Sequence, residues 1–278
     1  MTSIAVLGGG RIGEAFLAGS LASGTEPRDV VVSEKSKERA NELSRRYGVR
    51  SMSVRDAGES AETLVIAVKP GDAAAVLADL VEVIEVSETD KLVVSLAAGL
   101  TTEWFESQLP AGTAVVRVMP NTPMLVNKGM CVVAGGRYAT EEHLSAVAAM
   151  LESVGRVQVM PESSMDAVTA VSGSGPAYFF LMVEAMVDSA VTMGLPRAAA
   201  LELVVQTMVG AGEMLVAEEK NTGSLPLSVA SDLRYAVTSP GGTTAAALAE
   251  LERQGFRGAV LQALGAARAR SEQLGDRN

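Results

Sequence analysis

Two residue types that serve much enzyme chemistry are almost missing from this chain. Its 278 residues include one cysteine, Cys131, and one histidine, His143. A single cysteine forms no internal disulfide and no paired-thiol redox centre. A single histidine cannot build a multi-histidine metal site or relay, so we predict no bound metal. A serine–histidine–aspartate triad would depend on His143 alone. We expect Cys131 to be a buried small hydrophobe and His143 a surface residue.

Positive charge is scarce as well. Lys and Arg number 23 against 33 Asp and Glu, a net charge of −10, so we expect no nucleic-acid and no membrane partner. The start of the chain has no basic segment followed by a long apolar run, which predicts a cytoplasmic protein. The most apolar window, Ala177–Leu195, contains Glu184 and Asp188. Acids are costly in lipid, so we interpret this window as a buried helix of a soluble protein.

The first half of the chain alternates apolar β-branched runs with helical spacing. The predicted strands are Ile4–Leu7, Val30–Ser33, Leu64–Val68, Leu92–Leu96, Ala114–Val118, Met130–Ala134 and Arg156–Met160. The predicted helices are Arg11–Ser23, Lys35–Tyr47, Gly71–Val83 and Glu141–Ser153. Nearly continuous apolar runs are typical of strands covered on both faces. The alternation predicts an α/β, Rossmann-type, doubly wound and mainly parallel sheet.

The pattern changes after Pro161, where only helical periodicity follows. The predicted helices are Ser164–Met193, Arg197–Glu219, Thr243–Arg253 and Phe256–Leu274. We therefore expect a dinucleotide-binding domain over residues 1–161 and an all-helical domain over residues 162–278. Residues 177–183 are apolar all round, which one small domain cannot easily bury, so we expect homo-oligomers.

A glycine-rich loop follows the first predicted strand. Residues 8–13, Gly8-Gly9-Gly10-Arg11-Ile12-Gly13, fit G-x-G-x-x-G between a strand and a helix. Gly8 allows the tight turn, Gly10 lets the backbone approach a pyrophosphate, and Gly13 lets the helix pack closely on the strand. We predict that Gly8, Gly10, Arg11, Ile12 and Gly13 bind a dinucleotide. The alternative is a glycine-rich turn without a ligand.

The end of the second strand bears on the choice of cofactor. Glu34 lies 21 residues after Gly13, where an acid commonly binds the adenosine ribose 2′-hydroxyl, which favours NADH. The neighbours Ser33 and Lys35 offer a hydroxyl and a cation that suit the 2′-phosphate of NADPH. The alternative for this segment is an ordinary charged helix start. The cofactor is thus predicted as NADPH or NADH, with the choice open.

Two further strand ends supply candidate cofactor contacts. Ala67, Val68, Lys69 and Pro70 stand at the carboxyl end of a strand, the edge at which open α/β sheets bind ligands. Asn121 lies between two prolines after another strand and is a candidate hydrogen-bond partner near the nicotinamide. The alternatives are a solvated lysine at a strand end and a turn-forming asparagine.

The second half contains one comparable loop, residues 238–244. It precedes an Ala-rich helix, and its free N–H groups at a helix start suit a carboxylate. The predicted substrate-binding residues are Ser239, Gly241, Gly242, Thr243 and Thr244. The alternative is that its Ser or Thr is simply an N-cap.

The chain resembles the pyrroline-5-carboxylate reductase family over essentially its whole length. The motifs that carry the resemblance are residues 8–13, 67–70, 119–123 (MPNTP), 171–178 (VSGSGPAY) and 238–244 (TSPGGTT), in this order. The resemblance implies a Rossmann domain followed by a helical dimerisation domain, with dimers that often assemble into a decamer. This chain differs from many members of the family at Glu34, where they have a small or hydroxyl residue.

The resemblance also implies a reaction: hydride transfer from NAD(P)H to the C=N carbon of 1-pyrroline-5-carboxylate, giving L-proline. The loop 239–244 would hold the substrate carboxylate, and the catalytic residue Thr244 would lie close to the ring nitrogen. A β-hydroxyacid dehydrogenase is an alternative, but it needs a lysine on the long helix, and Ser172–Met193 contains none. A second alternative is a dinucleotide sensor without catalysis, which the intact second loop disfavours.

Overall fold

The computed structural model describes residues 3–222 and 226–275, apart from the side chains of residues 220–222. The described chain forms two compact units. The first comprises the chain up to Pro176 together with the chain from Leu264 onward, and the second comprises Ala177–Ala263. The division predicted between residues 161 and 162 remains a prediction, and each unit is described here by itself.

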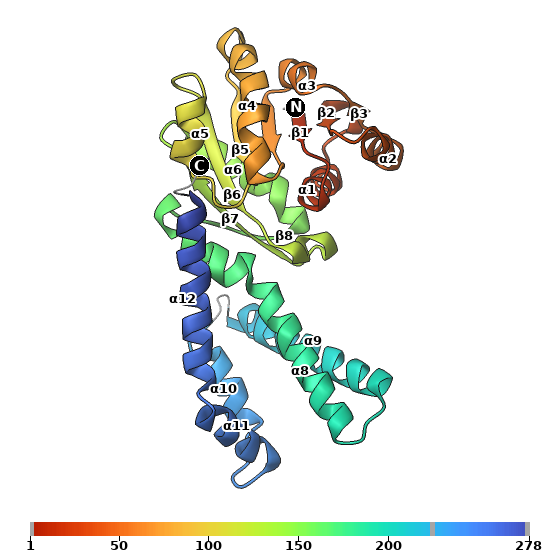
Figure 1. The fold of residues 1–278 in the computed structure, drawn as a ribbon, viewed down its shortest axis with the longest axis vertical. Coiled ribbons are helices and arrows are strands. Elements are labelled where there is room, and N and C mark those ends of the chain that lie inside the picture. The colour runs from red at the N-terminus through yellow and green to blue at the C-terminus, as the bar shows by residue number, and fades with distance from the viewer. Residues whose placement is uncertain (1–2, 223–225, 276–278) are drawn as a thin grey trace. The chain divides into compact units, whose positions relative to one another are not determined.

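The first unit contains an eight-stranded sheet in the order β3-β2-β1-β4-β5-β6-β7-β8 (Figure 1). The strands are β1 (Ile4–Leu7), β2 (Val30–Ser33), β3 (Arg50–Ser51), β4 (Thr63–Ile66), β5 (Leu92–Ser95), β6 (Ala114–Met119), β7 (Gly129–Gly135) and β8 (Gly155–Val159). Every neighbouring pair is parallel except β6 and β7, which are antiparallel. The predicted doubly wound, mainly parallel sheet is confirmed.

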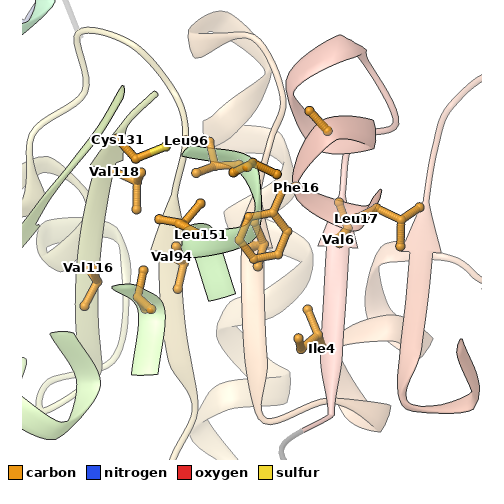
Figure 2. Packing of buried hydrophobic residues seen from close by; sticks show 14 of the residues in the cluster. Ile4, Val6, Phe16, Leu17, Val94, Leu96, Val116, Val118, Cys131 and Leu151 are labelled. Carbon is orange, nitrogen blue, oxygen red and sulfur yellow. The ribbon is translucent and has the colours of Figure 1, made fainter. Parts of the chain in front are cut away.

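Helices cover both faces of this sheet. They are α1 (Arg11–Ala22), α2 (Lys37–Tyr47), α3 (Val54–Ser60), α4 (Pro70–Glu85), α5 (Thr102–Gln108) and α6 (Glu141–Leu151). One core cluster packs alternate residues of the strands against α1, α2 and α6. Figure 2 shows Phe16 of α1 and Leu151 of α6 packed against side chains from the strands. The other joins the opposite strand face to α3, α4 and α5. Burial on both faces explains why the strands are continuous apolar runs.

Three elements of the first unit were not predicted. β3 has two residues, and α3 and α5 have seven each, too short for a periodic apolar pattern to show. Both short helices depend on local caps, because Ser53 accepts a hydrogen bond from Asp56 N–H and Thr101 accepts one from Trp104 N–H.

The isolated cysteine and histidine both have structural roles. Cys131 is fully buried in β7, as predicted, and burial raises the pKa of its thiol to about 11. His143 is half-buried at the start of α6. Its Nδ1 accepts a hydrogen bond from Thr140 N–H, and Thr140 Oγ1 accepts one from His143 N–H, which together form a capping box.

The predicted helix Ser164–Met193 is interrupted. The chain instead forms α7 (Met165–Val168), a π-helical turn over Thr169–Gly173, and then α8 (Gly175–Thr192). A π turn leaves i→i+4 partners unmatched and often marks a functional segment. A hydrogen bond joins α7 to the C-terminal part of the first unit: Ser271 Oγ donates to Asp166 Oδ1 at 2.6 Å.

The second unit is helical, as predicted. It holds most of α8, then α9 (Arg197–Thr222), α10 (Val229–Ala236), α11 (Thr243–Arg253) and the first part of α12 (Phe256–Gly275). Its one buried apolar cluster among the described residues comprises Val187, Ala190, Ala200 and Val204.

The window Ala177–Leu195, interpreted from the sequence as a buried helix, is mostly exposed in the single chain, where only Val187 and Ala190 are buried. Phe179, Phe180 and Leu181 are each about 60% exposed or more, and the cluster that packs α8 against α9 lies farther along the helix, at Val187 and Ala190. Among the described residues, Glu162–Thr192 and Arg197–Glu219 are long and apolar enough to cross a membrane by length and composition alone. Such exposed apolar surface indicates an interface that another partner covers.

Candidate dinucleotide and substrate sites

A cavity of about 280 Å³ opens at the carboxyl ends of β1, β2 and β4. It is lined by Leu7, Gly8, Gly10, Ser33, Glu34, Lys35, Val54, Ala67, Val68, Lys69, Asp72 and Val76. Residues from three separate predicted motifs therefore meet in one place, at the edge where parallel sheets bind ligands. Of the other predicted cofactor residues, Arg11, Ile12, Gly13, Pro70 and Asn121 do not line this cavity.

Of the four glycines in the first loop, Gly8 and Gly13 shape it and Gly10 leaves one side of it open. Gly8 has φ +110°, and a Cβ there would lie 2.6 Å from Ala67 O. A Cβ on Gly13 would lie 2.0 Å from Gly8 O, so α1 packs on the strand only without a side chain there. Gly10 is the N-cap of α1, and a Cβ on it would meet no protein atom within 4 Å. Its open side belongs to the cavity lining.

Glu34 contacts the glycine loop directly. Its Oε2 accepts a hydrogen bond from Gly9 N–H at 2.7 Å, and its Oε1 accepts one from Ser36 N–H at 3.0 Å. The carboxylate is therefore held in the cavity wall beside the loop. A fixed negative charge at this position suits a ribose hydroxyl and repels a 2′-phosphate.

We expect Glu34→Ser to raise the preference for NADPH over NADH. Removing a like charge a few ångströms from the 2′-phosphate is worth ~1–3 kcal/mol, a change of roughly five- to a hundredfold in the ratio of kcat/KM. Because the serine also loses the bond to Gly9 N–H, both cofactors are expected to bind more weakly, so the ratio is the informative quantity. Parallel steady-state kinetics with both cofactors measure it. An unchanged ratio would show that Glu34 points away from the ribose.

The start of α4 supplies the third part of the cavity wall. Lys69 is the N-cap residue of α4 and Pro70 its first residue, which suits proline because the first N–H of a helix needs no partner. Lys35 Nζ lies 2.6 Å from Asp72 Oδ1, with both side chains largely exposed. Sequence reasoning missed Asp72, because nothing in the local sequence pairs it with a residue 37 positions earlier.

Asn121 has two protein partners in the structure. Its Nδ2 donates to Ser172 O at 3.0 Å, and its Oδ1 accepts from Met130 N–H at 2.8 Å. In a regular helix Ser172 O would accept from residue 176, but Pro176 has no N–H. Asn121 thus replaces the missing helix donor. Its proposed contact with the nicotinamide remains a prediction.

The second loop lies within the second unit and ends at the start of α11. Gly241 has φ +68°, and Gly242 N–H donates to Ser239 O at 3.0 Å, which closes the turn. Gly242 is the N-cap of α11, and Thr243 and Thr244 are the first two helical residues. As a glycine, Gly242 provides no side-chain cap. Among the described residues, no side chain caps the first-turn N–H groups of α11. They are available to an anionic ligand.

This geometry excludes one of the two interpretations of the threonines and leaves the substrate-binding role a prediction. The alternative that one of them is simply an N-cap is wrong, since Gly242 holds that position. Thr244 is half-buried and Thr243 exposed. The half-buried hydroxyl of Thr244 therefore lies one residue inside the helix start.

Comparison with known proteins identifies the family of this chain. A family model described as pyrroline-5-carboxylate reductase dimerisation matches residues 162–274, and one described as NADP oxidoreductase, coenzyme F420-dependent, matches residues 3–99. The pyrroline-5-carboxylate reductase of Mycobacterium tuberculosis is 51% identical, covering 99% of this chain and 97% of that protein. The chain belongs to the pyrroline-5-carboxylate reductase family.

Other reductases of this family agree. The Corynebacterium melassecola reductase is 45% identical over 99% of both chains. The structure of the Coxiella burnetii reductase matches with a TM-score of 0.89 at 33% identity, covering 98% of each chain. The Plasmodium falciparum pyrroline carboxylate reductase, whose structure has NADP bound, matches with a TM-score of 0.84 at 29% identity, covering 99% of this chain and 98% of that one.

Proposed function

We propose that this protein reduces the C=N bond of 1-pyrroline-5-carboxylate to give L-proline, the final step of proline biosynthesis, with NADPH or NADH as the reductant. The observation that carries the proposal is the 51% identity to a pyrroline-5-carboxylate reductase over nearly the whole chain. Both loops that the reaction needs are present and have suitable backbone geometry.

The dinucleotide would lie in the cavity of the first unit. Its pyrophosphate fits the open side of Gly10 and the start of α1, where Arg11 and Ile12 are the first helical residues. Ser33, Glu34 and Lys35 would contact the adenosine ribose, and Ala67, Val68 and Lys69, which also line the cavity, would contact the neighbouring part of the dinucleotide. Pro70 would act through the backbone at the start of α4. When bound, the cofactor supplies the hydride for the imine carbon.

The substrate carboxylate would be held by Ser239, Gly241, Gly242 and Thr243, through the turn and the free N–H groups of α11. Thr244 would orient the ring nitrogen by a hydrogen bond. An imine that is already protonated is a good electrophile, so the chain's main task is to position it. A hydroxyl that only orients the nitrogen satisfies that requirement without acting as a strong acid.

The family's dimerisation domain supports self-association, and the exposed apolar side chains of α8 and α9 give it a physical basis. We propose that the dimer forms through these helices and assembles further into a decamer. Sedimentation of the full chain separates a dimer from a decamer. We also propose a cytoplasmic protein without nucleic-acid or membrane partners. In this view the exposed apolar helices face another subunit rather than lipid.

The test is turnover of purified protein with 1-pyrroline-5-carboxylate and each reduced cofactor, followed by loss of nicotinamide absorbance. Formation of proline at the rate of cofactor oxidation is the expected result. A β-hydroxyacid dehydrogenase would instead oxidise a hydroxy acid, for which the chain has no lysine on Ser172–Met193. A dinucleotide sensor would bind the cofactor without turnover.

A further inference from the structure

Both backbone polar groups of Gly9 are hydrogen-bonded to charged side chains. Its N–H donates to Glu34 Oε2 at 2.7 Å, and its carbonyl oxygen accepts from Arg39 Nε at 2.9 Å. Arg39 lies on the first turn of α2, whose N-cap Ser36 accepts a hydrogen bond from Arg39 N–H. Only one residue, Gly9, therefore separates the Arg39 guanidinium from the Glu34 carboxylate that lines the cavity.

Two carboxylates bind the remaining nitrogens of Arg39. Nη1 lies 2.8 Å from Glu42 Oε2, and Nη2 pairs with Glu14. Glu42 stands three residues further along α2 with its side chain 51% exposed, and such exposed pairs contribute little. The Glu14 side chain is 15% exposed and belongs to α1, so it ties α2 to the helix that follows the glycine loop.

Glu14 is itself held by several donors. Its Oε1 accepts from Arg46 Nη1 and from the Tyr47 hydroxyl, both at 2.9 Å. Burial raises the pKa of Glu14, but the hydrogen bonds from Arg39 and Tyr47 and the charges of Arg39 and Arg46 outweigh it, so this pKa lies below its ordinary value. Glu14 is therefore charged at neutral pH and keeps Arg39 in place.

We propose that Glu14 is a specificity-determining residue, which lowers the affinity for the 2′-phosphorylated dinucleotide by holding the Arg39 guanidinium against Gly9. A guanidinium beside the ribose would otherwise bind a phosphate through paired, charge-assisted hydrogen bonds. Held in these ion pairs, Arg39 does not line the cavity, whereas Glu34 does. The inference rests on the dinucleotide site of the proposed function.

The other cation beside Glu34 provides a matched control. Lys35 pairs with Asp72, but these side chains are 73% and 42% exposed, so the ammonium is free to move toward a phosphate in the wild type. Asp72 lines the cavity, which Glu14 does not. Asp72→Asn therefore removes the same unit of negative charge from a position nearer to the cofactor without releasing Arg39.

The experiment measures the dissociation constants of NADPH and NADH by calorimetry on the full-length protein without substrate. The variants are Glu14→Gln, Arg39→Met, the double variant and Asp72→Asn. Glutamine keeps the shape of Glu14, so the fold is retained. We expect Glu14→Gln to raise the NADPH/NADH affinity ratio by roughly tenfold, the value of one charge-assisted hydrogen bond. Arg39→Met alone should change this ratio by less than about twofold, since a held guanidinium contributes to neither cofactor's 2′ group.

The double variant decides whether Arg39 carries the effect. The increase in the NADPH/NADH affinity ratio should disappear in the double variant, Glu14→Gln combined with Arg39→Met. Asp72→Asn should give a clearly smaller increase in this ratio than Glu14→Gln. An unchanged ratio in Glu14→Gln, a gain that persists without Arg39, or an equal gain in Asp72→Asn overturns the proposal. Because binding is measured without 1-pyrroline-5-carboxylate, these outcomes are independent of whether the reductase activity is found.

Discussion

Gly10→Val is expected to abolish binding of NADPH and NADH while the protein stays folded. Gly10 lines the cavity, its φ of −66° suits any residue, and a Cβ there meets no protein atom within 4 Å. The valine side chain would instead fill the space through which a pyrophosphate approaches the backbone. Losing one or two hydrogen bonds to a charged phosphate, ~1.5–3 kcal/mol each, weakens binding by roughly a hundredfold or more. Calorimetric titration with each cofactor measures this.

Gly8→Ala is the comparison that separates cofactor binding from folding. Gly8 has φ +110°, and an added Cβ would lie 2.6 Å from a backbone oxygen, so this variant is expected to lose stability. Thermal unfolding of both variants should show a large decrease for Gly8→Ala and little change for Gly10→Val. If Gly10→Val binds NADPH as tightly as the wild type, the cofactor does not lie against this loop.

The sheet was predictable from sequence because burial on both faces leaves a direct signal. Residues 4–7 and 30–32 are apolar without a polar alternation, and the observed strands Ile4–Leu7 and Val30–Ser33 have the predicted bounds. The cavity was predictable for a related reason: Gly8, Glu34 and Lys69 each follow a strand end, and parallel strands bring their carboxyl ends to one edge.

Contacts between distant segments left no such signal. In the sequence, Arg39 is one of several charged residues at a helix start. Only the structure shows that it contacts Gly9 and Glu14. The contact of Asn121 with Ser172 O is likewise set by the π turn and by Pro176, which a periodic apolar pattern does not reveal. The sequence indicated that one small domain could not bury the apolar residues 177–183, but apolar composition alone does not say which residues of α8 its own chain covers.

Thr244→Val is expected to lower kcat/KM for 1-pyrroline-5-carboxylate by roughly ten- to a hundredfold, the value of one or two hydrogen bonds to a charged group. The change removes only the hydroxyl, and the first-turn N–H groups of α11 that would hold the carboxylate remain. Cofactor affinity should not change, because the dinucleotide cavity lies within the first unit. Thr244→Ser retains a hydroxyl and is expected to recover most of the activity.

The stability of the same variants tests whether Thr244 acts on substrate or on the helix. Loss of an N-cap costs about 1 kcal/mol. Gly242 occupies that position, so Thr244→Val should change the free energy of unfolding by less than about 0.5 kcal/mol, as for other surface substitutions. Unfolding and kinetics are measured on one preparation of each variant. Wild-type kinetics combined with reduced stability would remove Thr244 from the active site, whereas lost activity at unchanged stability, restored by serine, places its hydroxyl on the substrate.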